Sequence, residues 1–421
     1  MTTLKKLLAI LDVDDGEKSR KRKRRSDNDN DDDDMILQTF CERALPSYRG
    51  EKLLRKRWPE EYLRDLAGRE NSFVAEYRLD PKSFDLLSDM LESYLSVNKK
   101  MAKLSTNSAP ITTTSRLGTA SIILAGGRRM ESITHGLAES TTYRIFKKVV
   151  KAINKHPALK IEFDTSADFL TIKADNFNKL GDHDLFQYCV GAIDGLAIKT
   201  RTPNRELYKN TARFMSGSKK MVCINMQAVC QSDLQFVAVT CKHVGCTNDA
   251  IAFETSSLKT VCQSLPFPYH WIGDNAYTLT ESMIVPFPGQ NLHKTQPYLE
   301  AFNFYQSQLR ITIECAFGVL VRRWGILWKA MEYGLDFQFQ IVHACCRLHN
   351  FCIKRRLLPL PIVAPPPIIA LNANGSLTDS SWRLPVARDT LQTTRTGSTL
   401  RYSIVESLRA QGITRIRSHN S

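Results

Sequence analysis

Apolar side chains follow two different periods along this chain. Before residue 187 they recur every three to four positions, as at Phe84, Leu87 and Leu91, and this spacing predicts amphipathic helices. After residue 187 the period becomes two, most clearly over residues 221–230, where apolar and polar side chains alternate. Alternation of this kind predicts strands. The pattern therefore indicates a helical region followed by a mixed α/β region.

The helical region is predicted to span residues 41–155. A loop rich in Ser, Thr, Pro and Asn over residues 105–114 leads into a helix at residues 116–124. We expect this helix to end at Gly126 and Gly127, because glycine disfavours the helix interior.

Two further elements end the helical region. A short helix or turn is predicted at residues 130–137 and a long basic helix at residues 143–153, with residues 140–142 as its cap. This order is typical of a helix-turn-helix unit, although a helical bundle with solvent-exposed lysines has the same pattern. The basic residues that we predict to contact DNA in the first case are Arg144, Lys147, Lys148 and Lys151.

The α/β region is predicted over residues 185–356. Its strands are expected at residues 188–198, 221–230, 235–241 and 269–273, with a hairpin turn at residues 231–233. Its helices are expected at residues 249–262, 299–324 and 337–355. Three antiparallel strands, a helix, a strand and then helices are the order of the ribonuclease H-like fold. We therefore predict the mixed α/β (α+β) class, with a ribonuclease H-like catalytic core and a mixed sheet after a helical, helix-turn-helix-like domain.

Both ends of the chain differ in composition from its middle. Residues 1–40 contain a dense basic run followed by an Asp-rich tract, and no core can form from such a segment, so we expect it to be disordered. The basic run predicts a nuclear localisation signal, and a solvated charge run is the alternative. Its basic residues are Lys18, Arg20, Lys21, Arg22, Lys23, Arg24 and Arg25. Residues 357–421 read as a Pro-rich linker and a flexible basic tail, with a last amphipathic segment at residues 402–410.

Composition narrows the class of protein. The net charge is +15, which fits a nucleic-acid partner but is also compatible with an acidic membrane surface. No apolar stretch in the sequence reaches the roughly 18 residues of a membrane span, so we expect a soluble intracellular protein. The 11 cysteines include no Cys-x-x-Cys pair and predict buried free thiols rather than disulfides.

Three acidic residues carry the candidate chemistry. Asp194 and Asp274 each end an apolar, strand-like run, and Glu314 lies in the middle of a predicted helix. Tertiary folding can bring such residues together, and clustered carboxylates bind hard cations such as Mg²⁺ or Mn²⁺. Two such ions activate the attacking oxygen and stabilise the leaving oxygen in phosphodiester cleavage. Each acid taken alone is more often structural, but an unpaired carboxylate in an apolar frame is costly.

Neighbours of these acids have predicted roles as well. Arg310 lies one helical turn before Glu314 and is expected to face phosphate or to pair with Glu314. Gly318, one turn after Glu314, is expected to let the helix approach the sheet. Asp249 is a candidate fourth metal ligand, although capping the helix that follows it is the more ordinary role.

Several sequence blocks, in order, resemble those of PIF/Harbinger-type transposases, which are DDE superfamily endonucleases. The resemblance runs over residues 188–353, with a weaker similarity at residues 73–153. The blocks that carry it are Gly191 to Gly195, Asn225 to Cys230, Gly273 to Tyr277, Ile313 to Gly318, Arg323 to Leu327 and Leu348 to Phe351.

The resemblance implies a catalytic triad of Asp194, Asp274 and Glu314 that holds divalent metal. It also implies cleavage of DNA at terminal inverted repeats of a transposon and transfer of the freed 3′-hydroxyl to target DNA, whereas the basic run at residues 18–25 predicts a nuclear location. A separately encoded Myb-like DNA-binding protein and a homo-oligomer are possible partners on the same ground. The chain departs from the family at Leu196 and Ala197, where a polar pair is usual, and at residues 244–249. The alternative function is that of a domesticated nuclear DNA-binding or regulatory protein.

Overall fold

The computed structural model describes residues 68–97, 110–126, 137–204, 208–217, 219–289, 296–357 and 395–415. All of them belong to one compact unit, Arg57–Ser421. The predicted localisation signal, nearly all of the short helix at 130–137 and most of the Pro-rich linker lie outside the described residues. Among the helices in these ranges, none is long and apolar enough to cross a membrane.

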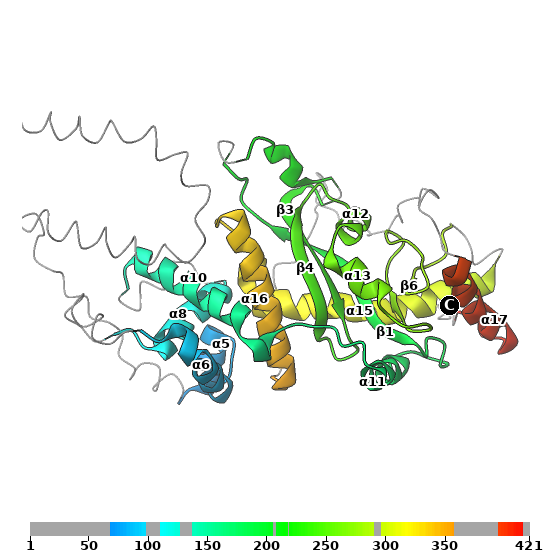
Figure 1. Cartoon of the computed structure of the whole chain (residues 1–421), viewed down its shortest axis with the longest axis horizontal. Helices are drawn as coiled ribbons and strands as arrows, with labels where there is room; N and C mark the ends of the chain where they lie inside the picture. The colour runs from blue at the N-terminus through cyan, green and yellow to red at the C-terminus, as the bar shows by residue number, and fades with distance from the viewer. Residues whose placement is uncertain are drawn as a thin grey trace, which may run out of the picture. The chain divides into compact units, whose positions relative to one another are not determined.

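A mixed sheet forms the centre of the unit (Figure 1). Its strands are β1 (Cys189–Lys199), β2 (Met215–Ser216), β3 (Met221–Cys230), β4 (Phe236–Val244), β5 (His270–Ile272) and β6 (Met283–Ile284). Strands β4, β3 and β1 are antiparallel neighbours, whereas β1, β5 and β6 run parallel, and β2 adds to β3. The four predicted strands are confirmed, and the two-residue strands β2 and β6 were too short to show a period.

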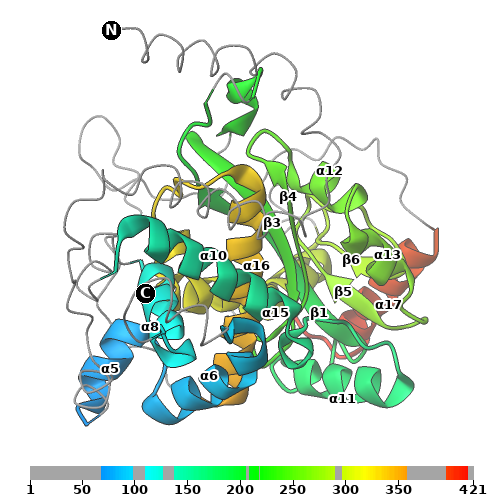
Figure 2. The same cartoon turned by 60° about the vertical axis from the view of Figure 1, so that its left-hand side comes forward.

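Helices surround this sheet (Figures 1 and 2). They are α5 (Glu70–Tyr77), α6 (Pro81–Leu95), α8 (Thr113–Leu124), α10 (Glu139–Lys155), α11 (Ala167–Asn178), α12 (Asp249–Glu254), α13 (Ser257–Gln263), α15 (Pro297–Arg323), α16 (Leu335–Lys354) and α17 (Arg395–Ala410). Short 3₁₀ turns occupy Pro157–Leu159, Thr211–Phe214 and Gly325–Leu327. Helix α15 packs on β1 and β3, α16 on β4, and α11 on β1.

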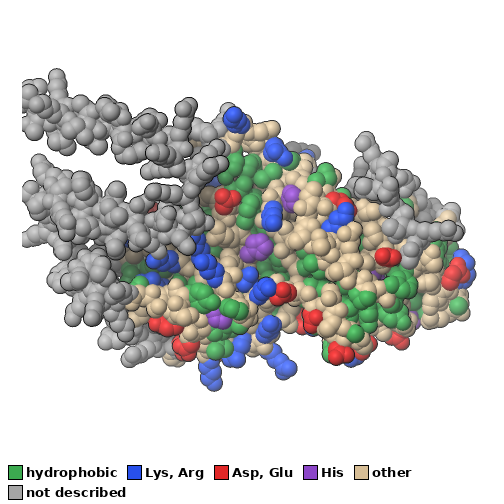
Figure 3. Space-filling model, in the orientation of Figure 1, with side chains coloured by type: hydrophobic (Ala, Val, Ile, Leu, Met, Phe, Trp, Pro, Cys, Tyr) green, Lys and Arg blue, Asp and Glu red, His purple; other side chains and the backbone are tan. Residues whose placement is uncertain are grey.

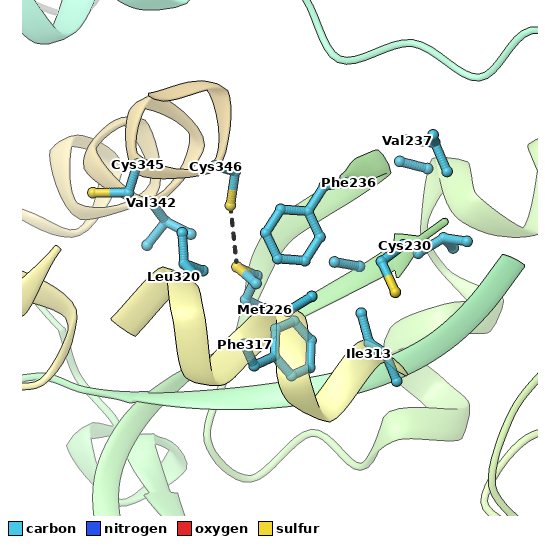
Figure 4. Packing of buried hydrophobic residues seen from close by; sticks show 14 of the residues in the cluster. Met226, Cys230, Phe236, Val237, Ile313, Phe317, Leu320, Val342, Cys345 and Cys346 are labelled. Carbon is cyan, nitrogen blue, oxygen red and sulfur yellow. Dashed lines mark hydrogen bonds between the residues drawn. The ribbon is translucent and has the colours of Figure 1, made fainter. Parts of the chain in front are cut away.

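The core lies between the sheet and helices α15 and α16 (Figure 4). Met226 and Phe236 from the sheet meet Phe317 of α15, and Phe236 stacks on Phe317 at 5.9 Å between ring centroids. Cys346 of α16 points its sulfur at Met226, with 3.8 Å between the two sulfur atoms. Ten free cysteines occur in the described ranges, eight of them buried, as the sequence predicts.

The helical region packs directly on the α/β region. Helix α10 lies along α16, where the Asn154 side chain donates to the Gln340 carbonyl at 2.8 Å and Tyr143 stacks near Tyr333. Helix α8 ends as predicted, because Gly126 has a φ of +93°, which a side chain would disfavour. These contacts fix α10 against the region that carries the sheet.

Two local predictions differ from the structure, and one helix was not predicted. Helix α10 begins at Glu139 rather than Tyr143, and no side chain caps it, so residues 140–142 form its first turn instead of its cap. The helix expected at 249–262 is split into α12 and α13, because the Ser256 hydroxyl bonds the Phe253 carbonyl and the Leu258 amide. Helix α11 is the helix that was not predicted.

The C-terminal tail contains a docked helix. The amphipathic segment predicted at 402–410 is the second half of α17, which packs on α15 and β6. Its Arg401 is 9% exposed and donates to the carbonyls of Val285 and Pro286, both at 3.3 Å. The same guanidinium lies 3.9 Å from the ring centroid of Phe287. Residues directly after β6 are thus held by the end of the chain.

Candidate active site

Asp194 lies in β1, the strand flanked by β3 and β5. Asp194 pairs with Ala228 of the antiparallel strand β3, and the parallel strand β5 lies on the other side of β1. One carboxylate oxygen, Oδ1, accepts from the backbone amide of Gly195 at 2.7 Å, and Oδ2 accepts from Arg310 at 3.3 Å. The side chain is 20% exposed, so this carboxylate is largely removed from water.

Asp274 is the second acid and follows β5. Because β5 runs parallel to β1 with Ile272 beside Ala192, the end of β5 delivers Asp274 next to Asp194. The Asp274 carboxylate accepts from the amide of Ala276 at 3.0 Å, and Gln306 of α15 donates to the Gly273 carbonyl at 2.7 Å. The loop that carries Asp274 is therefore tied both to the sheet and to α15.

Glu314 is linked to Asp194 through Arg310. It lies on α15 with its side chain 44% exposed, and Arg310 one turn earlier binds it at 2.6 Å. The predicted pairing of these two residues is confirmed, and the same guanidinium also bonds Asp194. Gly318 does not have the role predicted for it, since it is exposed and a Cβ there would meet no atom within 4 Å. Gly318 therefore does not set the distance between α15 and the sheet.

Asp249 is a fourth acid at the same place. Asn248, not Asp249, caps α12, because the Asn248 side chain accepts from the Ile251 amide at 2.8 Å. The capping role predicted for Asp249 is thus wrong. Its Oδ1 instead accepts from Asn225 at 3.1 Å and from Gln227 at 3.3 Å, both on β3.

Gly195 makes this arrangement possible. A Cβ at this position would lie 2.3 Å from Asp249 Oδ1, which no real side chain tolerates. The glycine that follows Asp194 therefore allows the carboxylate of Asp249 to lie against β1. Sequence reasoning missed Asn225 and Gln227, although the one signal available was that both are polar residues on one face of an otherwise apolar strand.

Electrostatic interactions join the aspartates. Burial, and next the charge of Asp274, raise the pKa of Asp194 to about 7. Burial also raises the pKa of Asp274, with a further contribution from the charge of Asp249. Arg310 opposes both shifts. Three carboxylates thus lie within mutual electrostatic reach, with one arginine as their compensating charge.

A buried phenol lies beside the same acids. Tyr277 is 3% exposed, its hydroxyl has no hydrogen-bond partner among the described residues, and its ring packs edge-on against Phe253. Burial and the charges of Asp194, Asp249 and Asp274 raise its pKa well above the ordinary value. An unpaired buried hydroxyl costs about 1–3 kcal/mol, so a ligand that accepts from it gains by binding here.

The donor set suits a hard divalent cation. All candidate ligands are carboxylate oxygens, the orphaned Tyr277 hydroxyl is available to a metal-bound group, and three negative charges share a single arginine. As the side chains stand, no three His, Cys, Asp or Glu residues in the described ranges are grouped so as to hold one ion. Arg310 lies between Asp194 and Glu314 and keeps their oxygens apart from a common centre.

Comparisons with known proteins agree with this geometry. Residues 193–350 match the family model described as DDE superfamily endonuclease. The similarity of the chain to the DDE superfamily of endonucleases lies in these residues. The resemblance read from the sequence blocks is confirmed, and all four acids lie inside the matched range. Domains of this superfamily use divalent metals and imply a ribonuclease H-like fold, with which the order β4-β3-β1-β5-β6 agrees.

Individual relatives of this DDE endonuclease domain are distant. The chain is 23% identical over 305 residues to "Protein ALP1-like" of Arabidopsis thaliana, which covers 67% of this chain and 70% of that protein. It is 22% identical over 224 residues to "Putative nuclease HARBI1" of Bos taurus and of Homo sapiens, covering 52% of this chain and 60% of each relative. The chain thus spans well under two thirds of those two nuclease-named relatives. No solved structure matches the chain.

The basic residues predicted to contact DNA lie outside the DDE endonuclease domain, on α10. Arg144, Lys147, Lys148 and Lys151 are all exposed, while the opposite face of α10 is buried. Figure 3 shows lysine and arginine side chains gathered over α10 and the neighbouring α16. Among the described residues this surface is positively charged.

Proposed function

We propose that this protein is a metal-dependent DNA endonuclease and transposase. It cleaves phosphodiester bonds at the ends of a transposon and transfers the freed 3′-hydroxyl to target DNA. The observation that carries the proposal is the group of buried aspartates in electrostatic contact, joined to Glu314 through Arg310, within a DDE endonuclease domain. Such a group is costly for a folded protein to maintain unless it binds a cation.

The acids have distinct roles in this proposal. Asp194, Asp274 and Glu314 hold the divalent metal, Mg²⁺ or Mn²⁺, and Asp249 is a fourth oxygen donor oriented by Asn225 and Gln227. When bound, two such ions supply activation of the attacking oxygen and stabilisation of the leaving oxygen.

DNA is recognised outside the acidic group. The basic side chains Arg144, Lys147, Lys148 and Lys151 of α10 contact the DNA backbone, in a helix-turn-helix-like region that reads the transposon ends. We further propose that the basic run at residues 18–25 directs the protein to the nucleus, and that a second copy of the chain and a Myb-like protein assist end recognition.

Cleavage of a defined DNA tests the proposal. Purified protein is incubated with a duplex that carries the inverted repeats flanking its coding region, with Mg²⁺ or Mn²⁺ or with EDTA. We expect metal-dependent nicking that Asp194→Asn reduces by at least about 10³-fold, because the mutation removes a ligand of both ions. The matched control is Asp168→Asn, an exposed aspartate on α11, which should cleave like the unmodified protein.

A second outcome identifies the alternative function. If the protein binds the duplex tightly but cleaves it no faster than Asp194→Asn, the enzyme assignment is wrong. The chain is then a domesticated, nuclear DNA-binding protein that keeps the fold of its ancestor.

A further inference from the structure

Arg310 binds two of the acids at once. Its Nη1 lies 3.3 Å from Oδ2 of Asp194 on β1 and 2.6 Å from Oε1 of Glu314 on α15. A single guanidinium therefore connects the sheet to the helix at the centre of the acidic group. Its side chain is only 22% exposed, so these contacts are partly protected from water.

A divalent cation would need the same oxygen atoms. Carboxylates bind a metal through their oxygens, and one oxygen of each acid here accepts from Arg310, so an ion shared by the two acids would compete with the guanidinium. The guanidinium has to move for Asp194 and Glu314 to share an ion.

We propose that Arg310 is an exchangeable counter-cation of this site. It holds Asp194 and Glu314 together until a divalent ion replaces it, and a DNA phosphate receives the displaced guanidinium. This inference rests on the proposed function, since it concerns the same metal and the same DNA. The inference adds an ordered exchange to the proposed function: Arg310 leaves the two carboxylates when the metal binds them, and it then binds a DNA phosphate.

The geometry favours such an exchange. Arg310 is long and flexible, and its partner Glu314 is nearly half exposed, so the guanidinium has a path towards solvent. Guanidinium binds phosphate in the same bidentate manner as carboxylate, which makes a DNA backbone a suitable acceptor. The aspartates keep their remaining contacts, because Gly195 and Ala276 amides hold Asp194 and Asp274 independently of Arg310.

One consequence is coupling between metal and DNA. If phosphate draws Arg310 away, DNA should strengthen metal binding, and metal should strengthen DNA binding by the same factor. Without Arg310 the two ligands should bind independently at this site. Coupling of this kind typically amounts to about 5–150-fold in affinity.

Metal binding by the full-length protein tests the exchange directly. Mn²⁺ affinity is measured by electron paramagnetic resonance without DNA for the unmodified chain, Arg310→Gln, Arg310→Lys and the control Arg409→Gln. We expect Arg310→Gln to bind Mn²⁺ about tenfold more tightly and Arg310→Lys to be intermediate, because lysine keeps the positive charge but on a shorter side chain without the planar guanidinium. Arg409, an exposed arginine paired with Glu406 three residues away, should be neutral.

DNA affinity provides the second readout. Fluorescence anisotropy of a labelled duplex is measured with and without Ca²⁺, and the Ca²⁺ enhancement seen with the unmodified chain should disappear in Arg310→Gln. Equal or weaker Mn²⁺ binding by a folded Arg310→Gln, or an unchanged Ca²⁺ enhancement, overturns the exchange. If instead Asp194→Asn binds Mn²⁺ as well as the unmodified chain does, the metal site itself is wrong, and the proposed function fails with it.

Discussion

Replacing Arg401 by alanine should detach the C-terminal helix from the catalytic domain. Arg401 lies on α17 and is 9% exposed, and its guanidinium donates to the carbonyls of Val285 and Pro286. Both carbonyls directly follow β6, which pairs with the strand that delivers Asp274. The perturbation therefore removes a contact between the end of the chain and the active-site side of the sheet.

The size of the effect follows from the contacts. A hydrogen bond from a charged donor contributes about 1.5–3 kcal/mol, and a cation–π contact such as that with Phe287 about 0.5–2 kcal/mol. Both hydrogen bonds are long at 3.3 Å, and Nε of Arg401 has no partner within the described ranges. Burial of the guanidinium, which also lowers its pKa, costs free energy as well. We therefore expect the sum of these contributions to lie near the lower end of their ranges. Arg401→Ala should cost about 3 kcal/mol of the free energy that holds α17 in place.

Hydrogen exchange measures this loss where it occurs. Amides of α17 and of residues 283–288 should exchange roughly 100-fold faster in Arg401→Ala, while those of β3 should be unchanged. The control Arg409→Ala removes an exposed ion pair on the same helix. It should change the free energy of opening that is measured by hydrogen exchange by less than about 1 kcal/mol. Unchanged protection of residues 283–288 in Arg401→Ala would refute the assignment of Arg401 as the anchor.

Two other predictions concern the acidic group. Gly195→Ala places a methyl group 2.3 Å from Asp249 Oδ1, so thermal or urea unfolding should show a loss of about 1–3 kcal/mol in the free energy of unfolding. The control Gly217→Ala should show little change, because a Cβ there meets no atom within 4 Å. An equal loss in both variants would contradict the contact with Asp249. The pKa of Asp194 is raised to about 7 from an unfolded value near 4, so its contribution to stability is present below about pH 4 and is lost as pH rises towards 7. In EDTA, the free energy of unfolding of Asp194→Asn should therefore fall less between pH 5 and 8 than that of the unmodified chain. Parallel pH profiles of the two proteins would show that Asp194 is not the titrating group.

Much of the mixed α/β region was predictable because its main strands, β1, β3 and β4, are long enough to show an apolar pattern and are separated by clear turns. The period of two at residues 221–230 gave β3 with its observed bounds, and the frames around Asp194 and Asp274 placed both acids at the sheet. The pairing of Arg310 with Glu314 followed from their spacing on one helix, which is a local property.

The errors arose where tertiary contacts decide. Asn248 and Asp249 are both good helix caps, and only the position of Asn225 and Gln227 on β3 determines that Asp249 turns towards the sheet instead. The exposed position of Gly318 depends on how α15 is rotated on the sheet, which helical spacing alone does not give. The anchoring of α17 is equally nonlocal, since Arg401 finds its acceptors more than a hundred residues earlier.

The link that Arg310 makes between α15 and β1 also bears on how the protein is synthesised. Asp194, Asp249 and Asp274 leave the ribosome before the residues of α15 that neutralise and complete their group. Until α15 packs, the growing chain has carboxylates that repel one another and no Glu314 beside them. A nascent chain without α15 therefore lacks the assembled acidic group, which is complete only when this helix is in place.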